Sequence, residues 1–156
     1  MFLTDRATLL TKDHLSKPSI CSLLAMEIIY FLNCPQLLLE PCLEAVTNPT
    51  FIPLRYFIQG RLHEDLKETK DAIQCYREAI RMGDQLCTSK NGFVSCGEHV
   101  PAFASYELAV LLCKSKLTFD EGKEFFAKSG DGYKACHFRN RLHVKIHLAK
   151  KAFGES

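Results

Sequence analysis

Glycine and proline are scarce in this chain, with 8 Gly and 6 Pro among 156 residues, and the apolar residues recur at helical spacing. This composition predicts an all-α protein. Long hydrophobic runs are also missing, because Glu27, Asn33 and Pro35 interrupt the apolar stretch of residues 20–39. A membrane-spanning helix is therefore not expected. Since 47% of the residues are hydrophobic, the chain can form a folded domain with its own core.

A strong charge of either sign is lacking as well. The formal net charge of +2 is too small to indicate a nucleic-acid partner, and we expect none. The basic residues are unevenly distributed, because the sequence from Lys134 onward holds six Lys or Arg residues and one acid, Glu155. The C-terminal end is therefore locally basic.

The chain contains 8 cysteines, spread over apolar faces of the predicted helices. Residues 1–13 include Asp5 and no continuous apolar run, so we do not expect a secretory signal there. These features favour reduced cysteines that act as small buried hydrophobic residues in a cytoplasmic protein.

Turn signals and helical periodicity divide the sequence into successive segments. The expected helices span 4–17, 19–32, 36–46, 53–66, 69–85, 101–115, 119–128 and 136–152. The expected organisation is a weak N-terminal helix (1–17), an apolar helix pair (18–52), a first repeat (53–86), an inserted loop (87–100), a second, degenerate repeat (101–132), and a basic capping helix with a tail (133–156).

Residues 54–81 have the spacing of one tetratricopeptide repeat. Large and small residues follow in the required order at Tyr56, Gly60, Ala72, Tyr76 and Ala79. A helix–turn–helix unit of roughly 34 residues needs small residues where its two helices approach each other. Gly60 and Ala72 are therefore expected at a helix–helix contact.

A second, weaker match follows at Ala109, Gly122 and Phe126. Its two small positions are thirteen residues apart, whereas those of the first unit are twelve apart. We expect one extra residue in the second turn. Together the matches predict helix–turn–helix repeats stacked as a short α-solenoid with a C-terminal capping helix.

The last predicted helix carries two apolar stripes. One consists of Leu142, Ile146, Ala149 and Phe153, the other of Val144, Leu148 and Ala152, and a basic flank of Arg139, His143, His147 and Lys150 lies between them. A capping helix normally has one apolar face. The second stripe is therefore expected to be covered by the chain's own segments or by another molecule.

Several segments resemble the tetratricopeptide repeat protein 39 family. These are EIIYFLN (27–33), the repeat around Gly60 and Ala72, SYELAVLL (105–112) and NRLHVKIHLA (140–149). The likeness covers most of the chain from about residue 18 and corresponds to the C-terminal part of the longer family members. It implies a non-enzymatic scaffold that acts through its repeats, and one member of the family is linked to cilium assembly.

The resemblance also implies a partner-binding groove. In such repeats the second, fifth, ninth and twelfth residues of the first helix face the concave side. The predicted groove residues are Leu54, Phe57, Arg61 and Glu64 in the first unit and Phe103, Tyr106, Val110 and Cys113 in the second.

Relatives that bind chaperone tails hold a terminal carboxylate with Lys and Asn in this groove. Here Phe57 and Tyr106 take the Lys positions, and Arg61 and Val110 take the Asn positions. The lining suits an apolar or aromatic peptide segment, such as a helix, better than a carboxylate. The alternative is that these residues pack under the chain's own terminal helix.

Two histidine patterns have spacings that a metal site would permit. His143 and His147 lie one turn apart, but the metalloprotease motif needs Glu where Val144 stands. Cys96 and His99 have a ligand-like spacing, but no second tight pair accompanies them. We therefore predict no metal site and no cofactor.

No nucleophile elbow, phosphate-binding loop or paired-carboxylate motif is present in the sequence. We predict a non-enzymatic scaffold or adaptor that binds a protein or peptide segment in its groove. The alternative function is a module that attaches to anionic membrane surfaces through its basic last helix.

Overall fold

The computed structural model describes residues 12, 16–31, 43–88, 98–134 and 136–154. Within these ranges the regular structure is entirely helical, which confirms the all-α prediction. The elements are α3 (Pro18–Phe31), the short 3₁₀ helix η1 (Pro49–Phe51), α5 (Ile52–Asp65), α6 (Thr69–Thr88), α7 (His99–Cys113), α8 (Phe119–Asp131) and α9 (Arg139–Ala152). Most of the helices expected at 4–17 and 36–46, and of the loop expected at 87–100, lies outside the described residues.

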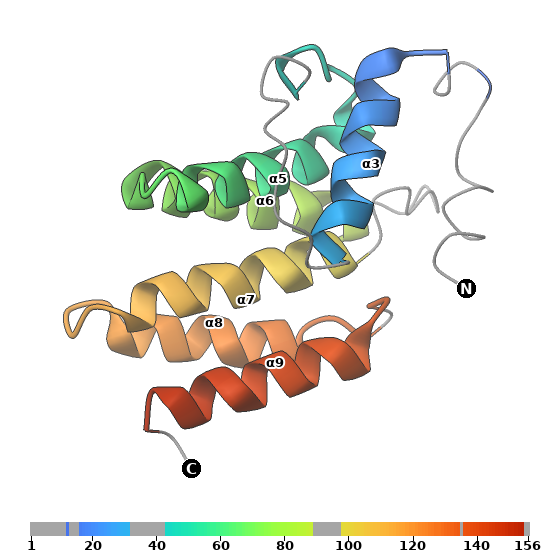
Figure 1. The fold of residues 1–156 in the computed structure, drawn as a ribbon. Helices are drawn as coiled ribbons and strands as arrows, with labels where there is room; N and C mark the ends of the chain where they lie inside the picture. Colours follow the sequence, from blue (N-terminus) through green and yellow to red (C-terminus); the bar gives the residue numbers. More distant parts are fainter. Residues whose placement is uncertain (1–11, 13–15, 32–42, 89–97, 135, 155–156) are drawn as a thin grey trace.

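Consecutive helices pair side by side in the stacked part of the molecule. Figure 1 shows α5 beside α6 and α7 beside α8, with α9 lying against the second pair. α6 also packs on α7, which joins the two hairpins. α3 is different, because it crosses the first hairpin instead of running alongside it (Figure 1). None of the described helices has the length and hydropathy required to cross a bilayer.

Glycines set the close approach of the helices. A Cβ atom added at Gly60 would lie 2.7 Å from two ring atoms of Tyr76, and one added at Gly122 would lie 3.1 Å from the Ala109 carbonyl oxygen. Ala72 is fully buried in the first hairpin. Gly60 and Gly122 therefore lie at helix–helix contacts, as their spacing predicted, because a side chain at either position would hold the helices apart.

The two hairpin turns differ in length. Residues 66–68 connect α5 to α6, and residues 114–118 connect α7 to α8. In the first turn Lys67 has a φ of 66°. In the second turn the Thr118 hydroxyl donates to the Leu112 carbonyl at 2.6 Å. The second turn is longer, as expected, but by more than the single residue predicted.

Polar contacts join the first hairpin to the second. Arg77 of α6 pairs with Glu121 of α8 at 2.6 Å. Asp84 of α6 accepts hydrogen bonds from Lys128 at 2.7 Å and from the Tyr133 hydroxyl at 2.8 Å. These bonds fix the register of α6 against α8 at both ends of their contact.

α9 buries only one of its two apolar stripes. Leu142 and Ile146 are buried, and the Phe153 ring centroid lies 6.5 Å from that of Phe126. Val144 and Leu148 are both 59% exposed. Of the two covers expected for the second stripe, the described segments of the chain supply none, and cover by another molecule stays a prediction. α9 begins at Arg139, later than expected, because Phe138 before it has a φ of 60°.

Candidate functional site

We call the predicted groove residues of α5 and α7 the α5–α7 face, because these two helices pack against each other. It consists of Leu54, Phe57, Arg61, Glu64, Phe103, Tyr106 and Val110. Two observations place the helices together: Tyr30 of α3 contacts both Phe57 and Phe103, and the charge of Glu64 on α5 acts on Tyr106 of α7. The face has a buried end and a half-exposed end.

The buried end is covered by α3. The Tyr30 ring stands edge-on to Phe57 at 4.7 Å and to Phe103 at 6.2 Å between centroids. Leu54, Phe57 and Phe103 are each no more than 1% exposed. Their placement as open groove residues is therefore corrected: they are core residues in this structure. The chain does cover its own face: α3 lies over Phe57 and Phe103, and Lys145 of the terminal helix α9 lies 5.0 Å from the Tyr106 ring centroid.

Glu107 links three helices at the centre of the face. Its Oε1 atom accepts a hydrogen bond from the Tyr30 hydroxyl at 2.5 Å and lies 3.5 Å from Nζ of Lys145 on α9. The same Nζ lies 5.0 Å from the Tyr106 ring centroid, which is a cation–π distance. Burial, followed by the Glu107 charge, raises the pKa of Tyr30, so its hydroxyl remains a donor.

Sequence reasoning missed Tyr30, Glu107 and Lys145. One signal for Glu107 was present, because it is the only acid between His99 and Cys113 in an otherwise mostly apolar helix. A carboxylate that is buried there needs a hydrogen-bonding or charged partner. The partners themselves come from distant segments and carried no local signal.

The half-exposed end of the face has mixed charge. Arg61 pairs with Glu64 at 3.3 Å, Lys114 lies 3.8 Å from Glu64, and the Tyr76 hydroxyl donates to Glu64 at 3.2 Å. Burial, followed by the Glu107 charge, raises the pKa of Glu64 above its ordinary value of 4.5, although Arg61 and Lys114 oppose the change.

Burial, followed by the charges of Glu107 and Glu64, also raises the pKa of Tyr106 to about 12. Its hydroxyl is therefore protonated at neutral pH and can donate a hydrogen bond. The half-exposed end thus offers a tyrosine and an arginine, which are residue types enriched at protein interfaces, beside the carboxylate of Glu64.

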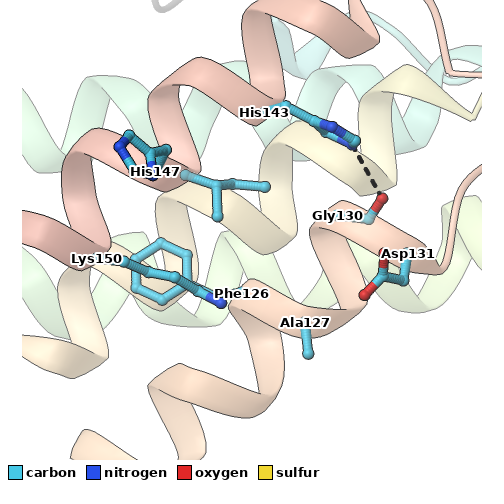
Figure 2. Close-up of a pocket in the computed structure, with 8 residues that line it drawn as sticks. Phe126, Ala127, Gly130, Asp131, His143, His147 and Lys150 are labelled. Atoms are coloured by element: carbon cyan, nitrogen blue, oxygen red, sulfur yellow. Dashed lines mark hydrogen bonds between the residues drawn. The ribbon is translucent and has the colours of Figure 1, made fainter. Parts of the chain in front are cut away.

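The basic flank of α9 borders a cleft between α8 and α9. Its lining residues are Phe126, Ala127, Gly130, Asp131, His143, Ile146, His147 and Lys150. The cleft encloses about 310 Å³, and in Figure 2 the His143 ring points toward the Gly130 carbonyl, 3.3 Å away. Arg139 lies beside it, with Nε 3.4 Å from Nε2 of His143. The structure therefore brings the four predicted flank residues together, next to the carboxylate of Asp131.

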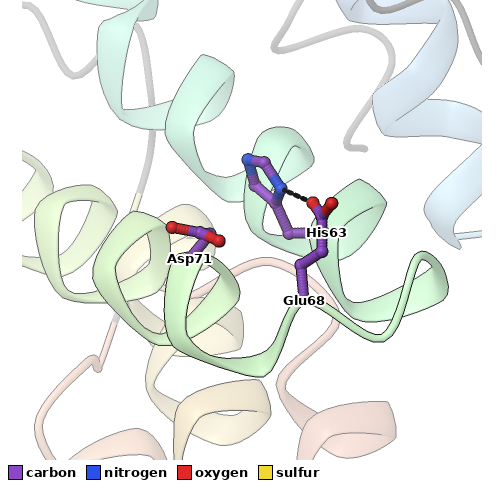
Figure 3. A group of neighbouring side chains, drawn as sticks. All are labelled: His63, Glu68 and Asp71. Atoms are coloured by element: carbon purple, nitrogen blue, oxygen red, sulfur yellow. Dashed lines mark hydrogen bonds and ion pairs between the residues drawn. The ribbon is translucent and has the colours of Figure 1, made fainter.

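One group with metal-ligand chemistry occurs among the described residues. His63, Glu68 and Asp71 surround the first hairpin turn, with their ligand atoms within 4.8 Å of one another (Figure 3). Glu68 already binds Nδ1 of His63 at 2.7 Å, and both acids are exposed. His63 and Asp71 also border a cavity of about 350 Å³ that Cys75 lines. The geometry permits a divalent ion but does not require one.

The histidine singled out in the inserted loop has a different environment. His99 begins α7 and is 2% exposed, and its Nε2 atom lies 2.7 Å from Oε1 of the buried Glu27. Cys96 lies outside the described residues. His99 is therefore held in a buried polar contact with Glu27, and nothing in the structure tests its pairing with Cys96.

Three cysteines near these helices are poor nucleophiles. Burial, followed by the Glu98 charge, raises the pKa of Cys136 to about 12 and that of Cys87 to about 11. Burial, followed by the Asp71 charge, also raises the pKa of Cys75. Because the thiolate is the reactive form, these thiols are weakly nucleophilic at neutral pH.

No family model matches the chain, and no solved structure matches it. The likeness to the tetratricopeptide repeat protein 39 family therefore stays a prediction from the residues.

Proposed function

We propose that the chain is a non-enzymatic scaffold that binds a helical protein segment on its α5–α7 face. In this proposal α5–α6 and α7–α8 are tetratricopeptide-type repeats, stacked as a short solenoid and capped by α9. Membership of the tetratricopeptide repeat protein 39 family, with a role in cilium assembly, is part of the same proposal and rests on the resemblance alone.

The repeat assignment is supported by a close glycine contact within each hairpin. Gly60 of α5 meets Tyr76 of α6 in the first hairpin, and Gly122 of α8 meets Cys113 of α7 in the second. Each hairpin also has a bulky buried ring at the corresponding place in its second helix, Tyr76 or Phe126. Stacked repeats require such recurring contacts, because each unit is stabilised by its neighbours.

The binding assignment rests mainly on one observation, the insertion of Tyr30 between Phe57 and Phe103. A face that accepts an aromatic side chain from a crossing helix has the shape and chemistry for helix recognition. Beyond α3 the face continues with the half-buried residues Arg61 and Tyr106. These two can contact a partner without any change in the core.

The test is affinity capture with the full chain, comparing Arg61→Ala/Tyr106→Ala with the wild type. We expect the double variant to lose a defined set of captured proteins while its helical circular dichroism is unchanged. Arg81→Ala is the matched control, because Arg81 lies on α6 and is 54% exposed. Identical captured sets for the wild type and the double variant would reject the face as a binding site.

A second candidate function, docking to anionic membranes, is favoured by the exposed stripe of α9. Val144 and Leu148 are exposed, and Lys150 and Lys151 lie in the last turn of the same helix. Apolar side chains beside cations are what an interfacial helix presents to lipid headgroups.

Vesicle co-sedimentation tests this alternative, with phosphatidylserine-containing vesicles at low and high salt. If the module docks, the wild type pellets at low salt, and Val144→Ser/Leu148→Ser does not. Leu117→Ser is the matched control, because Leu117 is 98% exposed in the turn between α7 and α8. Equal pelleting of all three proteins, or none by the wild type, would remove the alternative.

A further inference from the structure

α3 presents a narrow apolar stripe to the rest of the molecule. Ile20, Leu23, Met26 and Tyr30 are buried, and their spacing of three to four residues keeps them on one side of the helix. The other side is open to solvent, with Ile28 40% exposed. α3 therefore lies on the rest of the molecule with one side and leaves the other side exposed, although its sequence is apolar nearly all round.

Two buried polar contacts fix α3 on α7. Oε1 of Glu27 lies 2.7 Å from Nε2 of His99, and the Tyr30 hydroxyl donates to Glu107 at 2.5 Å. Glu27 and Tyr30 are three residues apart, so both point from the same side of α3. His99 and Glu107 stand two turns apart on α7. The pair of contacts therefore sets the register and direction of α3.

α3 differs from the other helices in how it is attached. α5 packs along α6 and α7 packs along α8, whereas α3 crosses α5 and has a smaller contact with it (Figure 1). Its polar anchors, Glu27 and Tyr30, both lie in the second half of the helix. Segments with fewer cooperative contacts can open without unfolding of the whole molecule.

We propose that α3 is a built-in ligand of the α5–α7 face, and that a partner helix of the same chemistry binds by displacing it. The partner helix carries an apolar stripe and a carboxylate that reaches His99. Three residues after the carboxylate it carries a tyrosine, whose ring lies between Phe57 and Phe103 and whose hydroxyl reaches Glu107. This inference rests on the proposed function and specifies its partner class. A helix in the same chain competes at a high effective concentration, so the covered face is selective for strong binders.

Hydrogen exchange on the wild-type full chain provides the first test. The probe is a peptide of residues 16–31 with Cys21→Ser, which presents the contacts of α3 in trans. We expect excess peptide to raise the exchange rate of the α3 amides in the chain by about tenfold while the α7 amides remain protected. If the α3 and α7 amides open together, with or without peptide, α3 is part of one cooperative unit and the inference fails.

Binding of the labelled peptide, followed by fluorescence anisotropy, provides the second test. The chain variant Tyr30→Ala weakens the resident helix, and we expect it to bind the peptide about tenfold more tightly than the wild type does. A peptide with Tyr30→Ala should lose this binding, and one with Ile28→Ala, changed on the solvent side, should keep it. Equal affinity of all three peptides would overturn the proposed register.

The outcomes separate this inference from the proposed function. If captured partners bind the chain while the α3 amides stay protected, partners use the half-exposed end of the face, and only the displacement of α3 is rejected. Suppose that Arg61→Ala/Tyr106→Ala captures the same proteins as the wild type while the peptide still displaces α3. The site under α3 then stands as a helix-binding site, and the half-exposed end of the face is rejected as one. If the peptide binds neither the wild type nor Tyr30→Ala, the inference is rejected.

Discussion

The two hairpins place small residues at their helix contacts but differ in what surrounds them. α7 of the second hairpin has neighbours in α6, α8 and α9, and nearly all its side chains are buried. α5 of the first hairpin is half-exposed along one flank, where Arg61 and Glu64 pair. The bulky residue also differs: the Tyr76 hydroxyl donates to Glu64, whereas Phe126 has no polar group and its ring centroid lies 6.1 Å from that of Tyr106.

This contrast indicates that the repeat pattern and the position of a hairpin in the stack act on different properties of its helices. The pattern fixes how closely the two helices of a hairpin approach. Position decides how much of each helix is buried, so α7 is mostly apolar while α5 can carry a charged flank. The difference can be examined by changing equivalent residues in the two hairpins.

The largest effects are expected from Tyr76→Ala and Phe126→Ala. Tyr76 is fully buried and Phe126 is 1% exposed. Removing a buried ring costs about 3–5 kcal/mol of unfolding free energy, measurable by urea denaturation followed by circular dichroism. Leu117→Ala is the control, and since Leu117 is 98% exposed it should stay within about 0.5 kcal/mol of the wild type. A large loss in only one hairpin would show that the two are not equivalent.

Smaller losses are expected from Gly60→Ala and Gly122→Ala. Overpacking costs about 1–3 kcal/mol, and the better helix propensity of Ala offsets about 1 kcal/mol of it. We expect net losses of similar size, because a Cβ atom at Gly60 would meet the buried Tyr76 ring at 2.7 Å, and one at Gly122 would meet the Cys113 Sγ atom at 2.5 Å and the Ala109 carbonyl oxygen at 3.1 Å.

Gly130→Ala is the matched control for these glycines. A Cβ atom there would meet only Ile146, at 3.7 Å, which is an ordinary contact. Its unfolding free energy should be unchanged or slightly raised. A neutral result at Gly60 would contradict the close approach of α5 and α6.

A pH effect is expected in the first hairpin through Glu64. Its pKa is raised in the folded state, chiefly by burial and then by the Glu107 charge. The folded chain therefore binds this proton more tightly than the unfolded chain does. The contribution of Glu64 to stability is fully present below its unfolded pKa near 4.5 and is lost as pH rises through the folded pKa.

Glu64→Gln should flatten this part of the stability profile. The measurement is Tm against pH from about 4 upward, for the variant and the wild type side by side. Glu124→Gln on the exposed surface of α8 is the control and should keep the wild-type profile. If Glu64→Gln has the same dependence of Tm on pH as the wild type, the titration of Glu64 does not cause that dependence.

The smallest effect is expected from Zn²⁺ at the first hairpin turn. His63 is already bound by Glu68, and both acids of the group are exposed. We expect Zn²⁺ to leave Tm unchanged in the wild type and in His63→Gln. Tight binding to the folded state would raise Tm by mass action, so a rise in the wild type alone would establish a metal site that distinguishes this turn from the second.

Much of the helical part could be predicted from local spacing. Gly60 and Gly122 were assigned to helix contacts because the residues that meet them lie within a helix–turn–helix unit. The groove prediction was less successful, since Phe57 and Phe103 are covered by α3. Periodicity finds the side of a helix that packs, but it does not say which segment packs on it.

The sequence by itself determined where the hairpin helices form and where they approach closely, because those features depend on residues within one or two turns or across one short connection. The tertiary structure alone decided that α3 lies over the α5–α7 face. The bonds that place it join residues 72 and 77 positions apart, from Glu27 to His99 and from Tyr30 to Glu107. Contacts of such separation leave no local pattern, since each partner forms its own helix equally well without the other.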